Sequence, residues 1–121
     1  MYKRQAVNTP YPKLIEATAA GFEAAKPGAT AADLYHAMDK VLTGGRGTPG
    51  RLGHGLGMQL TEGLSLIPAD HTPLEPGMVL TLEPVIESAP GRILVHEENI
   101  AITEAGSAWL STPAPERLLE L

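Results

Sequence analysis

Positions 75–84 carry the sequence EPGMVLTLEP, which combines a turn, an apolar strand and a strand stop in one short segment. Glu75-Pro76-Gly77 has the composition of a turn, and Met78 to Glu83 is typical of a largely buried strand. Pro84 lacks the N–H that a sheet ladder requires, so strand pairing should stop there. Glu83 thus ends an apolar strand, where a carboxylate is either solvated or part of a site.

Further strands are expected downstream of this segment. Arg92 to Glu97 and Asn99 to Thr103 have strand composition, and Glu104-Ala105-Gly106 closes a hairpin-like unit. Glu97 and Glu98 lie at the boundary of two apolar stretches, and strand alternation sends them to opposite faces. One carboxylate can therefore point inward at a cation while the other stays in water, because a buried carboxylate without a cationic partner is costly.

Two helices are predicted before the strands. Apolar residues repeat at intervals of three and four from about Lys13 to Ala25, and Lys26-Pro27-Gly28 stops that helix. Thr30 and Asp33 form a variant capping box for a second helix that should end near Leu42. Two helices followed by a run of strands predict an α+β fold.

A glycine-rich segment connects the second helix to the strands. Residues 44–57 contain seven glycines, so the backbone must turn sharply there or approach another group closely. No phosphate-binding loop pattern is present. His54 is flanked by glycines and followed by apolar residues that alternate as in a strand, which favours a site over the surface role expected for His36 and His71.

Composition sets the remaining limits. With 121 residues and 43% hydrophobic content, one domain is expected. The net charge of −5 without a basic cluster argues against nucleic acid or an anionic membrane as partner, and the absence of cysteine leaves His and carboxylates as metal ligands. No signal sequence or long apolar run is found, so a cytoplasmic location is the default. Residues 1–9 are expected to be disordered or derived from an adaptor.

Spacing alone leaves two interpretations of His54, Glu83 and Glu97 open. They are either a set of metal ligands or polar groups satisfied at strand ends, and the second situation is the commoner one in proteins.

A family resemblance distinguishes between them. GHGLG at 53–57, EPGMVLTLEP at 75–84 and HEENIAITEAG at 96–106 resemble, in the same order, the last three signature blocks of the pita-bread family of prolidase, aminopeptidase P, methionine aminopeptidase and creatinase. The resemblance covers about residues 10–112. It implies the C-terminal half of a pita-bread fold, with helices packed on a curved antiparallel sheet, and a partial catalytic domain over residues 10–121.

The resemblance also implies roles for individual residues. His54 would bind one metal ion, Glu83 would bind or bridge metals and help to deprotonate the nucleophilic water, and Glu97 would bridge both ions. Glu98 occupies a position that is not a ligand in the family. The implied cofactors are two divalent ions per complete site, chosen among manganese, cobalt, iron and zinc.

Departures from the family pattern limit the expected activity. The two aspartate ligands of the family have no counterpart, because Asp33, Asp39 and Asp70 stand in other contexts. Thr61, a candidate substrate-binding residue, occupies the position where family peptidases usually carry a histidine. Val95 replaces an arginine common in the proline-specific branch.

The sequence is therefore interpreted as a truncated metal-dependent hydrolase resembling Xaa-Pro aminopeptidase or prolidase. Its substrate would be a small peptide or a small zwitterion. Alternatives are a creatinase-like C–N hydrolase or lyase on the same fold, and a non-catalytic binding module. Alone, the chain is expected to be inactive, to bind metal weakly, and to self-associate, for example as a homodimer, through exposed apolar surface.

Overall fold

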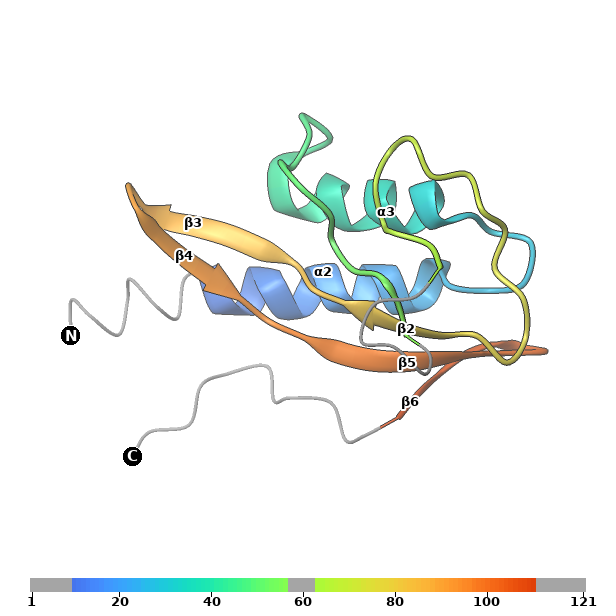
Figure 1. Cartoon of the computed structure of the whole chain (residues 1–121). Helices are drawn as coiled ribbons and strands as arrows, with labels where there is room; N and C mark the ends of the chain where they lie inside the picture. Colours follow the sequence, from blue (N-terminus) through green and yellow to red (C-terminus); the bar gives the residue numbers. More distant parts are fainter. Residues whose placement is uncertain (1–9, 57–62, 111–121) are drawn as a thin grey trace.

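The computed structural model describes residues 10–56 and 63–110 of the chain. Within these residues, two helices precede six short strands, and an antiparallel sheet lies beneath the helices (Figure 1). The α+β prediction is confirmed for this part of the chain. The elements are α2 (Pro10–Ala24), α3 (Ala31–Thr43), β1 (Gly55–Leu56), β2 (Val79–Leu82), β3 (Val85–Ala89), β4 (Arg92–Val95), β5 (Glu98–Thr103) and β6 (Gly106–Trp109).

Local sequence signals set the ends of both helices. The capping box at α3 is confirmed, because Thr30 accepts a hydrogen bond from the Asp33 N–H while the Asp33 carboxylate accepts one from the Thr30 N–H. Gly44 ends α3 with a φ of 76°, the left-handed conformation that glycine tolerates best. Helix α2 begins at Pro10, three residues earlier than expected, because proline is compatible with a first helical turn.

The core lies between the helices and one face of the four-stranded sheet, whose strand order is β1-β2-β5-β6 with all neighbours antiparallel. Helix α2 packs against both α3 and the strands. Alternate residues of β2 and β5 point toward the helices, as the period of two requires. The core-facing residues of these two strands are Leu80, Leu82, Ile100 and Ile102, each at most 2% exposed.

The two strand ladders form one long ribbon. Leu82 pairs with Glu98 in the β2–β5 ladder, and Val85 pairs with Val95 in the β3–β4 ladder. Between these pairs each strand advances by three residues, so no residue is inserted and the register is continuous. The His96 N–H donates to the Pro84 carbonyl at 3.2 Å inside the gap. Pro84 cannot return a hydrogen bond, which explains the break, and Figure 1 shows the two ladders running into each other.

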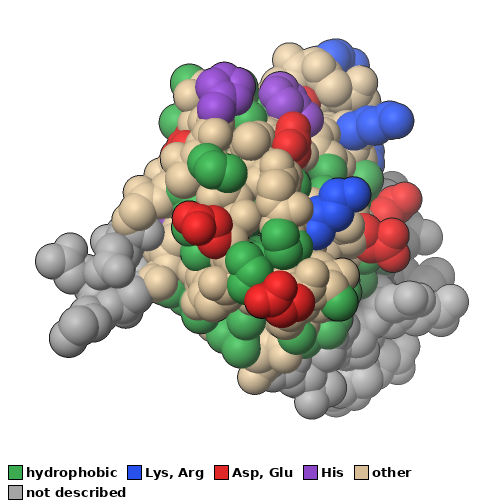
Figure 2. Space-filling model, turned by 90° about the vertical axis from the view of Figure 1, so that its right-hand side faces the viewer, with side chains coloured by type: hydrophobic (Ala, Val, Ile, Leu, Met, Phe, Trp, Pro, Cys, Tyr) green, Lys and Arg blue, Asp and Glu red, His purple; other side chains and the backbone are tan. Residues whose placement is uncertain are grey.

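Neither described helix is long and apolar enough to cross a membrane. On the face shown in Figure 2, acidic and basic side chains are interspersed with apolar ones.

Candidate metal centre

A close backbone contact holds His54 against strand β2. The Thr81 N–H donates to the His54 carbonyl at 2.8 Å. At the preceding position, a Cβ atom on Gly53 would lie 2.1 Å from the Thr81 carbonyl oxygen, a distance no side chain tolerates. Glycine at this position is what allows the loop to approach β2, as expected from the glycine-rich sequence.

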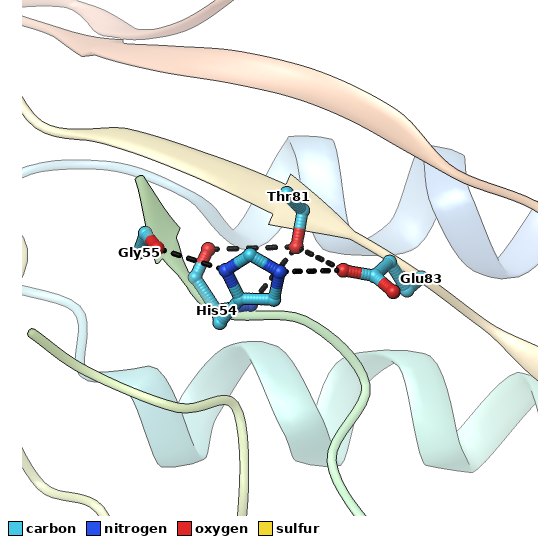
Figure 3. Close-up of polar contacts among 4 residues, drawn as sticks. All are labelled: His54, Gly55, Thr81 and Glu83. Carbon is cyan, nitrogen blue, oxygen red and sulfur yellow. Dashed lines mark hydrogen bonds and ion pairs between the residues drawn. The ribbon is translucent and has the colours of Figure 1, made fainter. Parts of the chain in front are cut away.

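The imidazole of His54 has one ring nitrogen committed to the backbone. Nδ1 lies 2.8 Å from the Gly55 carbonyl oxygen, which can only accept, so Nδ1 carries the proton. In the neutral ring Nε2 then has a free lone pair, and it lies 3.0 Å from Oε2 of Glu83 (Figure 3). Because a neutral Nε2 and a carboxylate oxygen are both acceptors, this contact requires a shared proton or a cation.

Glu83 is held from two directions. It follows the last residue of β2, and its N–H donates to the Leu52 carbonyl at 2.8 Å. Its Oε2 accepts a 2.6 Å hydrogen bond from the hydroxyl of Thr81. The carboxylate is 27% exposed, so it is both anchored and open to a ligand.

The continuous register locates Glu97. Since Pro84 faces His96 and Leu82 faces Glu98, Glu97 lies opposite Glu83, and directly opposed residues point to the same face of a ribbon. Like charges at such positions repel unless a cation lies between them.

Convergence of all three candidate ligands is nevertheless not observed. The structure joins His54 to Glu83, whereas the Glu97 side chain is exposed. Over residues 10–56 and 63–110 no three His, Cys, Asp or Glu side chains come close enough to hold a metal ion. Like charges at the directly opposed positions 83 and 97 repel each other, which disfavours a close approach of the two carboxylates. The complete ligand set remains a prediction.

Glu98 lies on the other face of the ribbon, opposite the core residue Leu82. It is 8% exposed, and its Oε2 lies 3.0 Å from Nε2 of His96. The ring of Tyr11 meets His96 edge-on, with the ring centroids 6.1 Å apart. The Glu98 carboxylate thus contacts His96 on the helix side of the ribbon, away from His54.

The donor set of this face fits a divalent metal. His54 offers a nitrogen lone pair and Glu83 a carboxylate oxygen, and ligand bonds of about 2.0–2.2 Å place neighbouring ligand atoms of one ion roughly 3 Å apart, like this pair. Asn99 lies opposite Thr81 on the same face, and its Oδ1 is buried without a hydrogen-bond partner among the described residues. His54, Glu83 and Glu97 are the residues of this face that could hold a metal.

The three aspartates named from the sequence have structural roles. Asp33 caps α3. Asp39 is 2% exposed. Burial raises the pKa of its carboxyl, but hydrogen bonds from Thr48, Thr43 and the Gly47 N–H together lower the pKa by more, so the net shift is downward. For Asp70, hydrogen bonds from Thr72 and the Ser65 N–H hold the pKa of the carboxyl below its ordinary value. The hydrogen bonds of these three aspartates go to residues other than His54 and Glu83.

Thr61 and Val95 are the positions where the sequence departs from the family pattern. Thr61 lies outside the described residues, so its substrate-binding role stays a prediction. Val95, in β4, is 56% exposed, and it lies two residues before Glu97. Sequence reasoning missed Thr81, although a polar residue two positions before Glu83 in an apolar strand was a usable signal.

The chain is similar in sequence to known peptidases. The chain matches metallopeptidase family M24 over residues 5–104. It is 37% identical over 114 residues to YkvY of Bacillus subtilis, an alignment that covers 92% of this chain and 31% of YkvY.

Solved structures show the same relationship. The chain superposes on dipeptidase PepE of Mycobacterium ulcerans with a TM-score of 0.82 at 31% identity, covering 93% of this chain and 31% of PepE. For the prolidase of Pyrococcus horikoshii the TM-score is 0.81 at 32% identity, covering 91% of this chain and 33% of the prolidase. The pita-bread resemblance is confirmed, and the chain spans about a third of the length of these relatives.

Proposed function

This chain belongs to metallopeptidase family M24, and from that membership we propose that it supplies His54, Glu83 and Glu97 to a two-metal centre that hydrolyses small peptides of the Xaa-Pro type. The peptidase class follows from the family. The two-metal mechanism, the substrate and the need for a further part of the fold are the proposal.

The observation that carries the proposal is the contact between His54 and Glu83. Nε2 and Oε2 lie 3.0 Å apart with the lone pair of Nε2 free, because Nδ1 is bound to the Gly55 carbonyl. The register adds a second carboxylate, Glu97, on the same face. One imidazole with two carboxylates suits manganese, iron or cobalt at least as well as zinc.

Each residue has a distinct task in this reaction. Divalent ions bound here would lower the pKa of a water molecule and polarise the substrate carbonyl. Glu83, held by the Thr81 hydroxyl, would serve as the base that accepts a proton from water. The Nδ1 hydrogen bond to the Gly55 carbonyl orients the ring of His54 so that Nε2 faces Glu83, and Nε2 would bind a metal ion there. Glu97 contributes negative charge from the opposite strand.

A second candidate is a non-peptidase reaction on the same fold, such as hydrolysis of a C–N bond in a small zwitterion. The structure leaves Val95 56% exposed near Glu97, where the proline-specific branch of the family commonly has arginine. A valine cannot bind a substrate carboxylate or carbonyl by hydrogen bonds. The relative rates on peptides and on small zwitterions distinguish the two candidates.

The test compares the 121-residue chain with a version extended upstream by the family's aspartate-bearing strands. We expect the short chain to bind manganese weakly and to be inactive, because three ligands cannot neutralise two divalent ions or fill their coordination shells. The extended protein should bind two ions and hydrolyse Xaa-Pro dipeptides faster than other dipeptides or creatine. Tight binding of two ions by the short chain, or equal turnover by both proteins, would refute the proposal.

A further inference from the structure

Thr81 joins the backbone of one candidate ligand to the carboxylate of another. Its side chain lies on β2 and is fully buried, with 0% exposure. The hydroxyl oxygen accepts a hydrogen bond from the His54 N–H at 2.9 Å. The same hydroxyl lies 2.6 Å from Oε2 of Glu83 (Figure 3).

The single hydroxyl proton of Thr81 goes to Glu83. The alternative acceptor, the His54 carbonyl, is 3.5 Å away, at the limit of hydrogen bonding, and it already accepts the Thr81 N–H at 2.8 Å. A hydrogen bond of 2.6 Å from a hydroxyl to a carboxylate is charge-assisted and stronger than a neutral one. The two distances thus identify Oε2 of Glu83 as the acceptor.

This hydrogen bond fixes the carboxylate that His54 faces. The oxygen held by Thr81 is Oε2, the same atom that lies 3.0 Å from Nε2 of His54. Glu83 has three side-chain torsions, and holding one carboxylate oxygen removes much of their freedom. Thr81 therefore sets the position of Oε2 relative to the imidazole.

We propose that Thr81 is a positioning residue of this metal centre, whose hydroxyl aims Oε2 of Glu83 at the ion that Nε2 of His54 binds. The proposal rests on the proposed function, since it requires His54 and Glu83 to bind metal. The competing explanation is that Thr81 only satisfies the buried His54 N–H, a role that would affect stability alone.

The experiment is a manganese titration of the isotope-labelled chain followed by NMR, because paramagnetic line broadening near His54 and Glu83 reports even weak binding. Thr81→Val removes the hydroxyl at nearly constant volume, and Thr81→Ser retains it. Thr18→Val is a matched control: Thr18 is 3% exposed and donates its hydroxyl to the Leu14 carbonyl at 2.9 Å within α2.

Loss of the hydroxyl should lower manganese affinity about 10–100-fold, the usual effect of removing a group that orients a ligand. Thr81→Ser should bind nearly as well as the wild type, and Thr18→Val should lose stability without losing affinity. An affinity of Thr81→Val equal to that of the wild type would overturn the positioning role and leave the proposed function intact. Absence of broadening at His54 and Glu83 in the wild type would instead overturn the metal site in this chain.

A measurement without metal keeps the test decisive if Thr81→Val does not fold. In the wild-type chain, the Thr81 hydroxyl proton should exchange slowly with water and show a nuclear Overhauser contact to the Glu83 side chain. The Glu83 carboxylate carbon should also differ in chemical shift from that of the exposed Glu87. A rapidly exchanging hydroxyl proton and matching carboxylate shifts would contradict the proposal.

Discussion

The hydroxyl of Thr48 donates a 2.6 Å hydrogen bond to the buried carboxylate of Asp39. Thr48 lies in the glycine-rich loop, residues 44–57, that leads to His54. Asp39 also accepts hydrogen bonds from the Thr43 hydroxyl and the Gly47 N–H, and Tyr35 accepts from the Thr48 N–H. The loop is thus attached to α3 by a set of buried and partly buried polar contacts.

The Asp39 network should make folding sensitive to acid. Burial raises the pKa of Asp39, but its hydrogen bonds have the larger opposite effect, so the folded pKa lies below the unfolded value of 3.8. The stabilisation is therefore fully present above about pH 4 and is lost as pH falls toward the folded pKa. Asp39→Asn should cost about 1–3 kcal/mol at neutral pH, because the amide supplies donors where acceptors are needed.

Urea denaturation between pH 7 and pH 2.5 measures this effect. The acid-dependent loss of stability should be smaller in Asp39→Asn than in the wild type, whereas Glu16→Gln, on the exposed surface of α2, should behave like the wild type. If Asp39→Asn keeps the full acid dependence, the assignment to Asp39 is incorrect.

Gly53→Ala should destabilise the chain more than Gly50→Ala does. An added Cβ at Gly53 would lie 2.1 Å from the Thr81 carbonyl oxygen, whereas nothing lies within 4 Å of one at Gly50, where only the φ of 77° is unfavourable. We expect a loss of about 1–3 kcal/mol or more at Gly53 from overpacking, against about 1–2 kcal/mol at Gly50. Thermal unfolding monitored by circular dichroism would compare them, and equal losses would contradict the close contact.

The sequence predicted the elements whose signals are local. The capping box of Thr30 and Asp33 and the strand before Glu83 follow from nearby residues, and both are found. Strand β3 after Pro84 was not predicted, because proline indicated a strand end and the pairing resumes only through the distant β4. Strand β6 was also missed, since its partner β5 decides its conformation more than its composition Gly-Ser-Ala-Trp does.

The residues of the candidate site also differ in how far local sequence marks them. Glycines and a strand end single out His54 and Glu83 as candidates, the family resemblance supplies their expected role as metal ligands, and the structure joins them. The role of Thr81 depends on distances across two segments, 27 residues apart in sequence, which no local pattern encodes. The position of Glu97 opposite Glu83 required the register of the ribbon.

Neighbouring acids 97 and 98 should respond differently to substitution. Glu97→Gln should lower manganese affinity at least tenfold, because it removes a negative ligand. Glu98→Gln should leave affinity unchanged and reduce stability, since Glu98 is buried against His96. Manganese titration and urea denaturation of both variants give the comparison, and a larger loss of affinity in Glu98→Gln would reverse the assignment of faces.

Position 61 should govern peptide specificity in the extended protein. Thr61→His should raise kcat/KM for an Xaa-Pro dipeptide more than for non-peptide substrates, because an imidazolium can donate to a developing oxyanion more strongly than a hydroxyl. Steady-state kinetics on both substrate classes measures the ratio. An equal change for every substrate would argue against contact between residue 61 and the peptide.

His54, Glu83 and Glu97 are proposed to bind metal on one face of the ribbon, whereas Glu98 is not. Anomalous X-ray diffraction from manganese-soaked crystals of the upstream-extended protein tests this proposal most directly. Anomalous peaks should lie about 2.0–2.3 Å from Nε2 of His54 and from carboxylate oxygens of Glu83 and Glu97. Peaks at Glu98 and His96, or none at His54 in crystals with bound manganese elsewhere, would contradict it.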